Sequence, residues 1–236
     1  MIVLICASSI HKTMGLYLQQ LEEAGIDYKW GEPETKIGHN LDWKGKLLWQ
    51  RQALSALPSS EHVFLTDGWD VILQGNRAEI ELKLPTDHIL ISGEKNCWPD
   101  PNCQHLYPMG PTPWMFVNSG CIVGKASDLL IEMERGFAEA LPDLVADDQR
   151  FWTWLFLTGD KIRIDYNCNL FQSMSMHIVG YDFAVNQDTH RLFNCRTGTT
   201  PNFLHWNGGT DWTVQALRAL GMRHENSLRV PKLRAN

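Results

Sequence analysis

The chain has 236 residues, of which 44% are hydrophobic and 20% are charged, and its formal net charge is −6. This length suffices for one sizeable core, so we expect a single domain over residues 1–236, in which residues from about 221 to 236 form a tail. The acidic balance and the absence of a Lys/Arg cluster argue against a nucleic-acid-binding protein, and no apolar run reaches the ~20 residues that a membrane-spanning helix requires.

The N-terminal segment predicts a β-α-β unit. Residues 1–6 form a short apolar run that indicates a buried strand. Apolar residues at helical spacing predict a helix over about residues 13–24, which Gly25 closes, and residues 26–30 predict a second strand. This order favours an α/β fold with a mostly parallel sheet flanked by helices. The first run is too short for a signal peptide, so we expect a cytoplasmic protein whose six cysteines are mostly buried free thiols.

Further helices and strands alternate along the rest of the chain. The predicted helices cover residues 42–57, 129–140, a segment that begins at 147, and 211–220, and the predicted strands cover residues 63–65, 88–92, 115–123, 161–165 and 202–206. The five prolines of residues 93–113 predict a long loop, which compact domains commonly use for function. Whether Cys97 and Cys103 pair across this loop stays open. Residues 177–200 fit either a hairpin or an irregular excursion.

Two carboxylates follow the central predicted strand. Asp67 and Asp70 are three residues apart, and Gly68 between them permits a tight turn. A turn at the carboxyl end of a strand lies where open α/β sheets bind their ligands. Two hard oxygen ligands on one turn suit Mg²⁺ or Mn²⁺, although an isolated Asp-x-x-Asp is more often an ordinary surface turn.

Other polar motifs follow in a fixed order. They are Thr66-Asp67-Gly68-Trp69-Asp70-Val71, Cys97-Trp98-Pro99, Asn118-Ser119-Gly120 within residues 117–124, Asp147-Asp148-Gln149-Arg150-Phe151, Leu170-Phe171-Gln172, and His205-Trp206-Asn207-Gly208. Together they resemble the glycosyltransferase domain of the procollagen lysyl hydroxylases and the related collagen glycosyltransferases. The resemblance extends from the first strand to about residue 210.

The resemblance implies a Rossmann-like GT-A fold and an enzyme that moves a hexose from UDP-glucose or UDP-galactose to a hydroxyl acceptor. It further implies a bound Mn²⁺, with Mg²⁺ as the alternative, and Asp67, Asp70 and His205 as metal ligands. Mn²⁺ accepts both carboxylate and imidazole groups and neutralises a diphosphate leaving group. Taken alone, His205 reads as a core histidine, and its order after Asp67 and Asp70 reverses that interpretation.

The resemblance also assigns roles to further residues. On the donor side these are Ser8, Lys46, Trp69, Asn207 and Gly208; in catalysis, Asp147, Asp148 and Asn118; and on the acceptor side, Trp98 and Gln172. Several have a structural alternative: helix capping for one of the two aspartates, a turn position before Gly120 for Asn118, a surface position for Lys46, a core or rim position for Trp69 and a loop anchor for Trp98.

Two departures from the family pattern are Trp206 and Cys121, which replace glycines, and Trp206 is expected to reshape or close the site. The acceptor is open: hydroxylysine or galactosyl-hydroxylysine of a collagen-like protein, another glycan, a small molecule or a modified DNA base. Rival interpretations are a non-catalytic module that binds sugar nucleotides and a divalent-metal phosphoesterase. The sequence leaves the donor sugar, the anomeric outcome and the oligomeric state undetermined.

Overall fold

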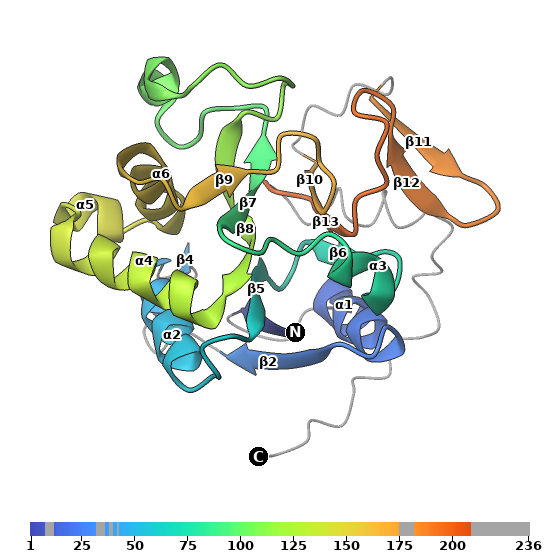
Figure 1. Cartoon of the computed structure of the whole chain (residues 1–236), viewed down its shortest axis with the longest axis horizontal. Helices are drawn as coiled ribbons and strands as arrows, with labels where there is room; N and C mark the ends of the chain where they lie inside the picture. The colour runs from blue at the N-terminus through green and yellow to red at the C-terminus, as the bar shows by residue number, and fades with distance from the viewer. Residues whose placement is uncertain (8–11, 32–35, 38–39, 42, 175–181, 209–236) are drawn as a thin grey trace.

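The computed structural model describes the chain except for residues 8–11, 32–35, 38–39, 42, 175–181 and 209–236 (Figure 1). Three expectations therefore lie outside the described residues: the helix at 211–220, the tail, and the position of Ser8. Among the described helices, none combines the length and the hydropathy that a bilayer crossing requires. The expected cytoplasmic location stays a prediction.

A six-stranded sheet forms the centre of the molecule. Its strands are β1 (Ile2–Cys6), β2 (Asp27–Gly31), β5 (His62–Asp67), β7 (Ile89–Glu94), β8 (Phe116–Lys125) and β9 (Ile162–Ile164). They lie in the order β2-β1-β5-β8-β7-β9, and all except β8 run in the same direction. The predicted α/β architecture with a mostly parallel sheet is confirmed. Because β8 is reversed, its N-terminal half passes the carboxyl ends of both β5 and β7.

One face of this sheet is covered by helices. Leu4 and Leu65 of the central strands belong to the core cluster on this face, together with Leu47 and Leu129. The covering helices are α2 (Trp43–Ser55), α4 (Ala126–Glu139), α5 (Pro142–Val145) and α6 (Asp148–Thr158). Side chains alternate along a strand, so the same strands supply a second set of apolar groups to the other face.

The other face packs against α1 (Lys12–Glu23) and a small second sheet. Met14, Leu18 and Leu21 recur at helical spacing in α1 and are buried, which explains why this segment is an amphipathic helix. Phe64 of β5 stacks on Phe203 of the second sheet with ring centroids 4.7 Å apart. The two sheets therefore share one aromatic core.

The second sheet consists of β10 (Phe171–Ser173), β13 (Phe203–His205) and β6 (Val71–Leu73), with β13 in the middle. The strand expected at residues 202–206 is β13, and it pairs here rather than in the central sheet. Its antiparallel register with β6 places His205 opposite Val71. Since β6 begins directly after the turn that holds Asp67 and Asp70, this register brings the histidine to the carboxylates.

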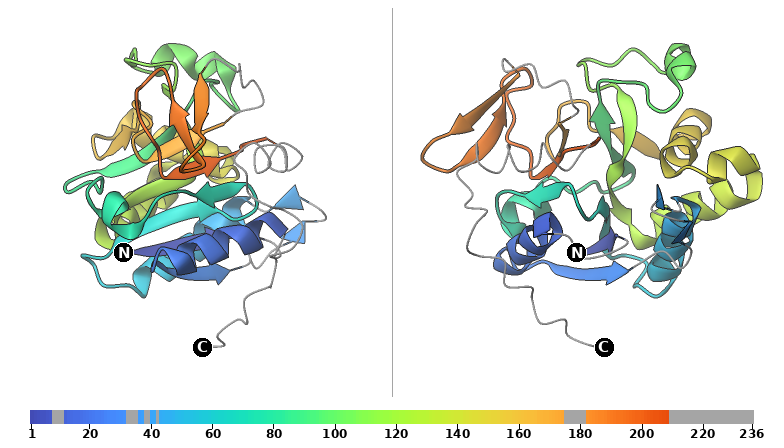
Figure 2. Two further views of the ribbon diagram at one scale, coloured as in Figure 1. Left: turned by 90° about the vertical axis from the view of Figure 1, so that its right-hand side faces the viewer. Right: turned by 180° about the vertical axis from the view of Figure 1, so that it is seen from behind.

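The remaining elements are short. They are α3 (Arg77–Glu81), the 3₁₀ helix η1 (Pro101–Leu106), and the strand pairs β3 (Lys36–Ile37) with β4 (Asn40–Leu41) and β11 (Phe183–Asn186) with β12 (Arg191–Asn194). Within the ambiguous segment 177–200, of which residues 177–181 lie outside the described residues, β11 and β12 form a hairpin that projects from the side of the molecule away from α4 and α5 (Figure 2). All six cysteines, each within the described residues, are free thiols, and three of them are buried.

Candidate active site

The turn between β5 and β6 is held tightly against the first strand. A β-carbon built on Gly68 would lie 2.8 Å from Cβ of Ala7 and 3.0 Å from Cγ2 of Ile5. Only a residue without a side chain fits there, which fixes the path of the chain between Asp67 and Asp70. The turn therefore presents both carboxylates at the carboxyl edge of the central sheet.

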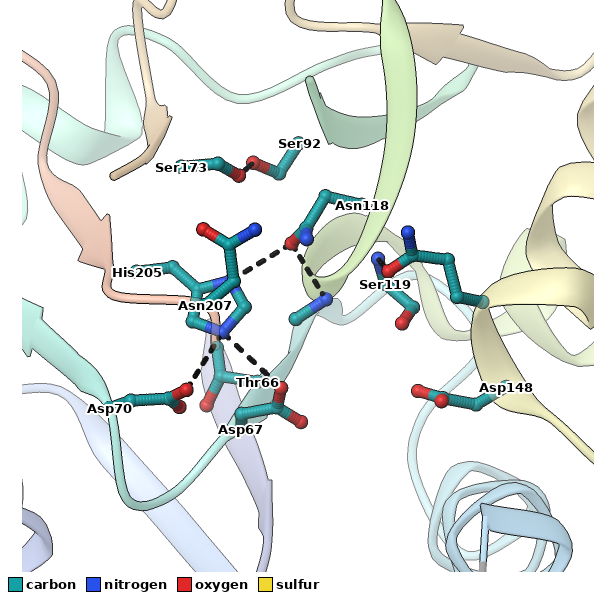
Figure 3. A network of polar contacts seen from close by, with 12 residues as sticks. Thr66, Asp67, Asp70, Ser92, Asn118, Ser119, Asp148, Ser173, His205 and Asn207 are labelled. Carbon is teal, nitrogen blue, oxygen red and sulfur yellow. Dashed lines mark hydrogen bonds and ion pairs between the residues drawn. The ribbon is translucent and has the colours of Figure 1, made fainter. Parts of the chain in front are cut away.

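Asp67, Asp70 and His205 converge at this edge (Figure 3). Nε2 of His205 lies 3.4 Å from Oδ2 of Asp67 and 3.3 Å from Oδ2 of Asp70. One ligand atom from each of the three residues falls within 4.8 Å of the others, and in the described part of the chain no second such cluster is present. Two carboxylate oxygens and one imidazole nitrogen form a donor set that suits Mn²⁺ or Mg²⁺.

The electrostatics of this cluster favour bound positive charge. Burial alone would lower the pKa of His205, but the carboxylates of Asp70 and Asp67 outweigh it and raise the pKa to about 10. Burial acts in the opposite sense on Asp67, where Lys46 and His205 hold the pKa well below its usual range. The raised pKa favours the protonated form of His205, and a metal ion would compete with that proton for Nε2.

The orientation of His205 is set by Asn118. Nδ1 of His205 donates to Oδ1 of Asn118 at 2.9 Å, and the same oxygen accepts the backbone N–H of Gly120 at 3.1 Å. Nε2 is therefore the nitrogen that faces the carboxylates. A second partner that fixes the ring of a ligating histidine is a common feature of metal sites.

Lys46 lies behind this cluster. It is 4% exposed, and its Nζ donates to Oδ1 of Asp67 at 2.5 Å and to Oδ2 of Asp148 at 2.6 Å. Burial would lower the pKa of Lys46, but Asp148 and Asp67 raise it above its ordinary value. The surface position that was the alternative for this lysine does not apply.

The acidic pair at the start of α6 divides into two environments. Asp147 is the N-cap, and its side chain accepts the backbone N–H of Arg150 at 2.9 Å. Asp148 is 4% exposed and faces Lys46. Burial raises the pKa of Asp148, with Lys46 opposing and Asp67 adding to the rise.

Glu94, at the carboxyl end of β7, is a site residue that the sequence analysis missed. It is 3% exposed, and its Oε1 accepts from Gln149 at 2.6 Å and from Asn118 at 3.2 Å, while Oε2 accepts from Asn207 at 3.0 Å. Burial raises the pKa of Glu94 to about 7, against the hydrogen bonds that favour its charged form. The sequence feature that could have identified Glu94 is its position at the end of a predicted apolar strand, three residues before Cys97.

These residues surround a cavity of about 690 Å³. Nine predicted site residues line it: Asp67, Asp70, Trp98, Asn118, Asp147, Asp148, His205, Asn207 and Gly208. Unpredicted lining residues are Trp43, Glu94, Asn96, Pro99, Ser119, Gly120 and Gln149. One polar atom there has no partner among the described residues, since the buried Oδ1 of Asn207 accepts no hydrogen bond.

Three of the other predicted site residues do not line the cavity. Lys46 lies behind its wall, and Trp69 packs half-buried against the core that surrounds α1. Gln172 is fully buried in β10, where it donates to the Ser173 carbonyl and accepts from Asn194. Neighbouring side chains of a turn point to different sides, and alternate side chains of a strand point to opposite faces. The order of residues along the chain therefore did not predict which of these side chains face the cavity.

Trp206 likewise does not close the cavity. Its side chain is 2% exposed and packs with Ile72 and Leu204 in a separate cluster, while its backbone N–H donates to the carbonyl of Asp70 at 2.8 Å. The expectation that Trp206 reshapes the site is therefore wrong for its side chain, because the alternation of the strand directs it to the side away from His205.

Comparison with known proteins identifies relatives over most of the chain. The family model of the PLOD GT domain matches residues 2–222. Protein R699 of Acanthamoeba polyphaga mimivirus is 30% identical over 223 residues, which are 88% of this chain and 46% of R699. The multifunctional procollagen lysine hydroxylase and glycosyltransferase LH3 of Rattus norvegicus is 27% identical over 194 residues, which are 74% of this chain and 26% of LH3. The chain thus spans less than half of the length of these curated relatives.

Solved glycosyltransferases share the architecture. The glycosyltransferase involved in the glycosylation of the major capsid of PBCV-1 has a TM-score of 0.54 at 14% identity, with 94% of this chain and 98% of that chain covered. The galactosyltransferase LgtC, solved with donor and acceptor sugar analogues, has a TM-score of 0.54 at 11% identity, with 94% and 95% covered. At such identities the likeness concerns the fold alone, and the expected GT-A fold is confirmed.

Proposed function

Because the chain belongs to the PLOD glycosyltransferase-domain family, we propose that it is a metal-dependent enzyme that transfers glucose or galactose from a UDP-sugar to a hydroxyl acceptor. The observation that carries this proposal is the meeting of Asp67, Asp70 and His205 with Asp148 and Asn118 in one cavity. A diphosphate held through a metal ion at the first three residues would place the donor sugar in the cavity that the other two also line.

The donor set fits a hard divalent cation. Asp67, Asp70 and His205 would hold Mn²⁺ or Mg²⁺, and Asn118 presents Nε2 of the histidine to that position. When bound, such an ion neutralises the negative charge that develops on the departing diphosphate. The unpartnered Oδ1 of Asn207 offers an acceptor to a donor hydroxyl on the same side.

The sugar side of the cavity is acidic. Asp148 lines the cavity, and its carboxylate is hydrogen-bonded by Lys46 at Oδ2 and by the Ser119 side chain. Such a carboxylate can accept a sugar hydroxyl or stabilise the positive charge of an oxocarbenium-like transition state. Asp147 also lines the cavity and remains the second candidate for this role. Glu94 holds Asn118 and Gln149 in place, so these amides need no rearrangement when a ligand enters.

The acceptor enters past Trp98, whose side chain is 67% exposed at the rim. An exposed indole suits the apolar face of a sugar or the aliphatic part of a side chain. Hydroxylysine or galactosyl-hydroxylysine in a collagen-like protein is the acceptor that the family resemblance implies, and the relative LH3 is named as a procollagen lysine hydroxylase and glycosyltransferase. A glycan, a small molecule or a modified DNA base are the alternatives.

Titration calorimetry tests the donor assignment. UDP, UDP-glucose and UDP-galactose are titrated in Mn²⁺ and then with excess chelator. Binding that requires the ion supports the proposal, and a preference between the sugars identifies the donor. If none of the three compounds binds, either with Mn²⁺ or with chelator, the proposed function is contradicted. Transfer to galactosyl-hydroxylysine or hydroxylysine peptides then separates an enzyme from a binding module, and phosphate release from UDP would favour the phosphoesterase.

A further inference from the structure

We propose that Lys46 is a positioning residue that joins the metal-binding carboxylate of Asp67 to the sugar-side carboxylate of Asp148, and that its ammonium does not bind the donor. This inference rests on the proposed function. It assigns to Lys46 a role different from the nucleotide contact that the family resemblance implies.

The contacts of Lys46 are directed into the protein. Its Nζ lies 2.5 Å from Oδ1 of Asp67 and 2.6 Å from Oδ2 of Asp148, and the residue is not part of the cavity wall. Trp43, one helical turn earlier, does line the cavity, and its ring centroid lies 5.7 Å from Nζ. The indole is therefore the group that α2 presents to the cavity, while the ammonium stays behind it.

The two bonds divide the oxygens of each carboxylate. On Asp67, Oδ1 faces Lys46 and Oδ2 lies 3.4 Å from Nε2 of His205. On Asp148, Oδ2 faces Lys46, and the Ser119 side chain also hydrogen-bonds to this carboxylate. A single ammonium thus binds one oxygen of each aspartate.

The same ammonium also fixes how far apart the two carboxylates lie. Asp67 and Asp148 come from β5 and α6, they are mutually repulsive, and each is bonded to the buried cation. Without the ammonium, the repulsion between the two neighbouring carboxylates would drive them apart or cause one of them to take up a proton. The span between the metal position and the sugar position therefore depends on Lys46.

Two of the three N–H donors of the Lys46 ammonium are bound to the aspartates, and Lys46 does not line the cavity. To reach a phosphate in the cavity, the ammonium would have to move away from these two short charged hydrogen bonds. Charge-assisted hydrogen bonds are stronger than neutral ones, and a buried carboxylate that loses its cation is costly. The two roles differ in what they predict. A phosphate ligand contributes to UDP affinity, whereas a positioning residue contributes to turnover through Asp148.

The test compares Lys46→Met, Asp148→Asn and the double variant, with Lys44→Met as the matched control on the exposed side of the same helix. In Mn²⁺, Lys46→Met is expected to change the calorimetric Kd for UDP by less than about threefold and to lower kcat by about 100-fold or more, in the range of a lost acid–base or orienting group. The kcat of the double variant should be no lower than that of Asp148→Asn alone, because Lys46 is proposed to act on turnover through Asp148.

A readout independent of activity is the melting temperature of the metal-free protein. Lys46→Met leaves the buried carboxylate of Asp148 without its cation, whereas Asp67 keeps its contact with His205. Adding Asp148→Asn removes the uncompensated charge, so the double variant should melt higher than Lys46→Met. A loss of UDP affinity of about tenfold or more in Lys46→Met, or rate losses that multiply in the double variant, overturns the inference. Absence of ion-dependent UDP binding in the wild-type protein instead contradicts the proposed function, so the two failures are distinguishable.

Discussion

Gly120 lies directly against the imidazole of His205. A β-carbon built on Gly120 would fall 2.0 Å from Cε1 of the ring, and its backbone N–H donates to the same Asn118 oxygen that holds Nδ1. The observed position of His205 therefore depends on both the amide group and the missing side chain of this residue.

Gly120→Ala is expected to displace His205 and to lower Mn²⁺ affinity about 10- to 100-fold, the usual effect of changing a group that orients a metal ligand. Isothermal titration with Mn²⁺ measures it. Gly124→Ala on the same strand is the matched control, because its new methyl meets Cγ1 of Ile89 at 3.0 Å, away from the site. Equal affinities for the two variants would contradict the role of Gly120.

Asp70→Ala is expected to remove the Mn²⁺-dependent part of UDP binding. Asp70 supplies one of the three clustered candidate ligand atoms. Burial lowers the pKa of His205, and the charge of Asp70 makes the largest contribution to raising it. UDP affinity should fall to the value measured in chelator, while the melting temperature shows that the fold is retained. Asp160→Ala, exposed after α6, serves as the control. Unchanged UDP affinity in Mn²⁺ would rule out Asp70 as a metal ligand.

Metal binding should depend on pH through His205. The carboxylates raise the pKa of this residue to about 10 from 6.5, so at pH 7 Nε2 carries a proton in the metal-free protein. The proton must leave when a metal binds there, so Mn²⁺ affinity should rise about tenfold per pH unit from about pH 6.5 to 8.5. Titration in buffers of different ionisation enthalpy measures the released proton.

The His205→Gln variant provides the control for this slope, because its amide cannot release a proton. A pH-independent affinity in the wild-type protein would show that His205 is neutral or is not a ligand. The same shift affects the metal-free fold. His205 contributes stability that is fully present below the unfolded pKa of 6.5 and is lost as the pH rises through about 10.

Glu94 should act on stability in a lower pH range. Burial raises its pKa from 4.5 to about 7, so the folded state holds a proton that the unfolded state has released. Stability of the metal-free protein should therefore fall as the pH rises between these values, by at most about 3 kcal/mol from this group. Urea unfolding at several pH values measures this contribution as the difference between wild type and Glu94→Gln.

Glu94→Gln removes this pH-dependent contribution to stability. The NH2 group of the new amide would face the N–H groups of Asn118, Gln149 and Asn207, so a loss of stability that does not vary with pH is also expected. Glu139→Gln, exposed at the end of α4, is the control. Parallel pH profiles for wild type and Glu94→Gln would mean that Glu94 is ionised throughout this range.

Local patterns were sufficient to predict most elements and the two carboxylates. Met14, Leu18 and Leu21 specify α1 by spacing alone, and the abrupt end of the apolar run before Asp67 marks the edge of β5. Neither pattern contains the pairing of β13 with β6, which brings His205 to the site. That pairing depends on contacts between distant segments, so only the family resemblance connected the histidine to the turn.

Side-chain direction is the feature that the sequence did not reveal. Trp69 and Trp43 are both tryptophans near the metal turn, but the turn directs Trp69 to the core of α1 and α2 presents Trp43 to the cavity. Glu94 belongs to no local motif, because its three partners come from β8, α6 and the segment after β13. Its role depends on their meeting in space.

The pairing of β13 with β6 has a consequence for the order in which the protein is made. Asp67 and Asp70 leave the ribosome on the order of a hundred residues before His205, because the chain is synthesised from its N-terminus. A nascent chain that ends before β13 contains two of the three clustered ligands and lacks the partner strand that completes the small sheet. Assembly of the three groups into one cluster therefore follows translation of the chain through β13.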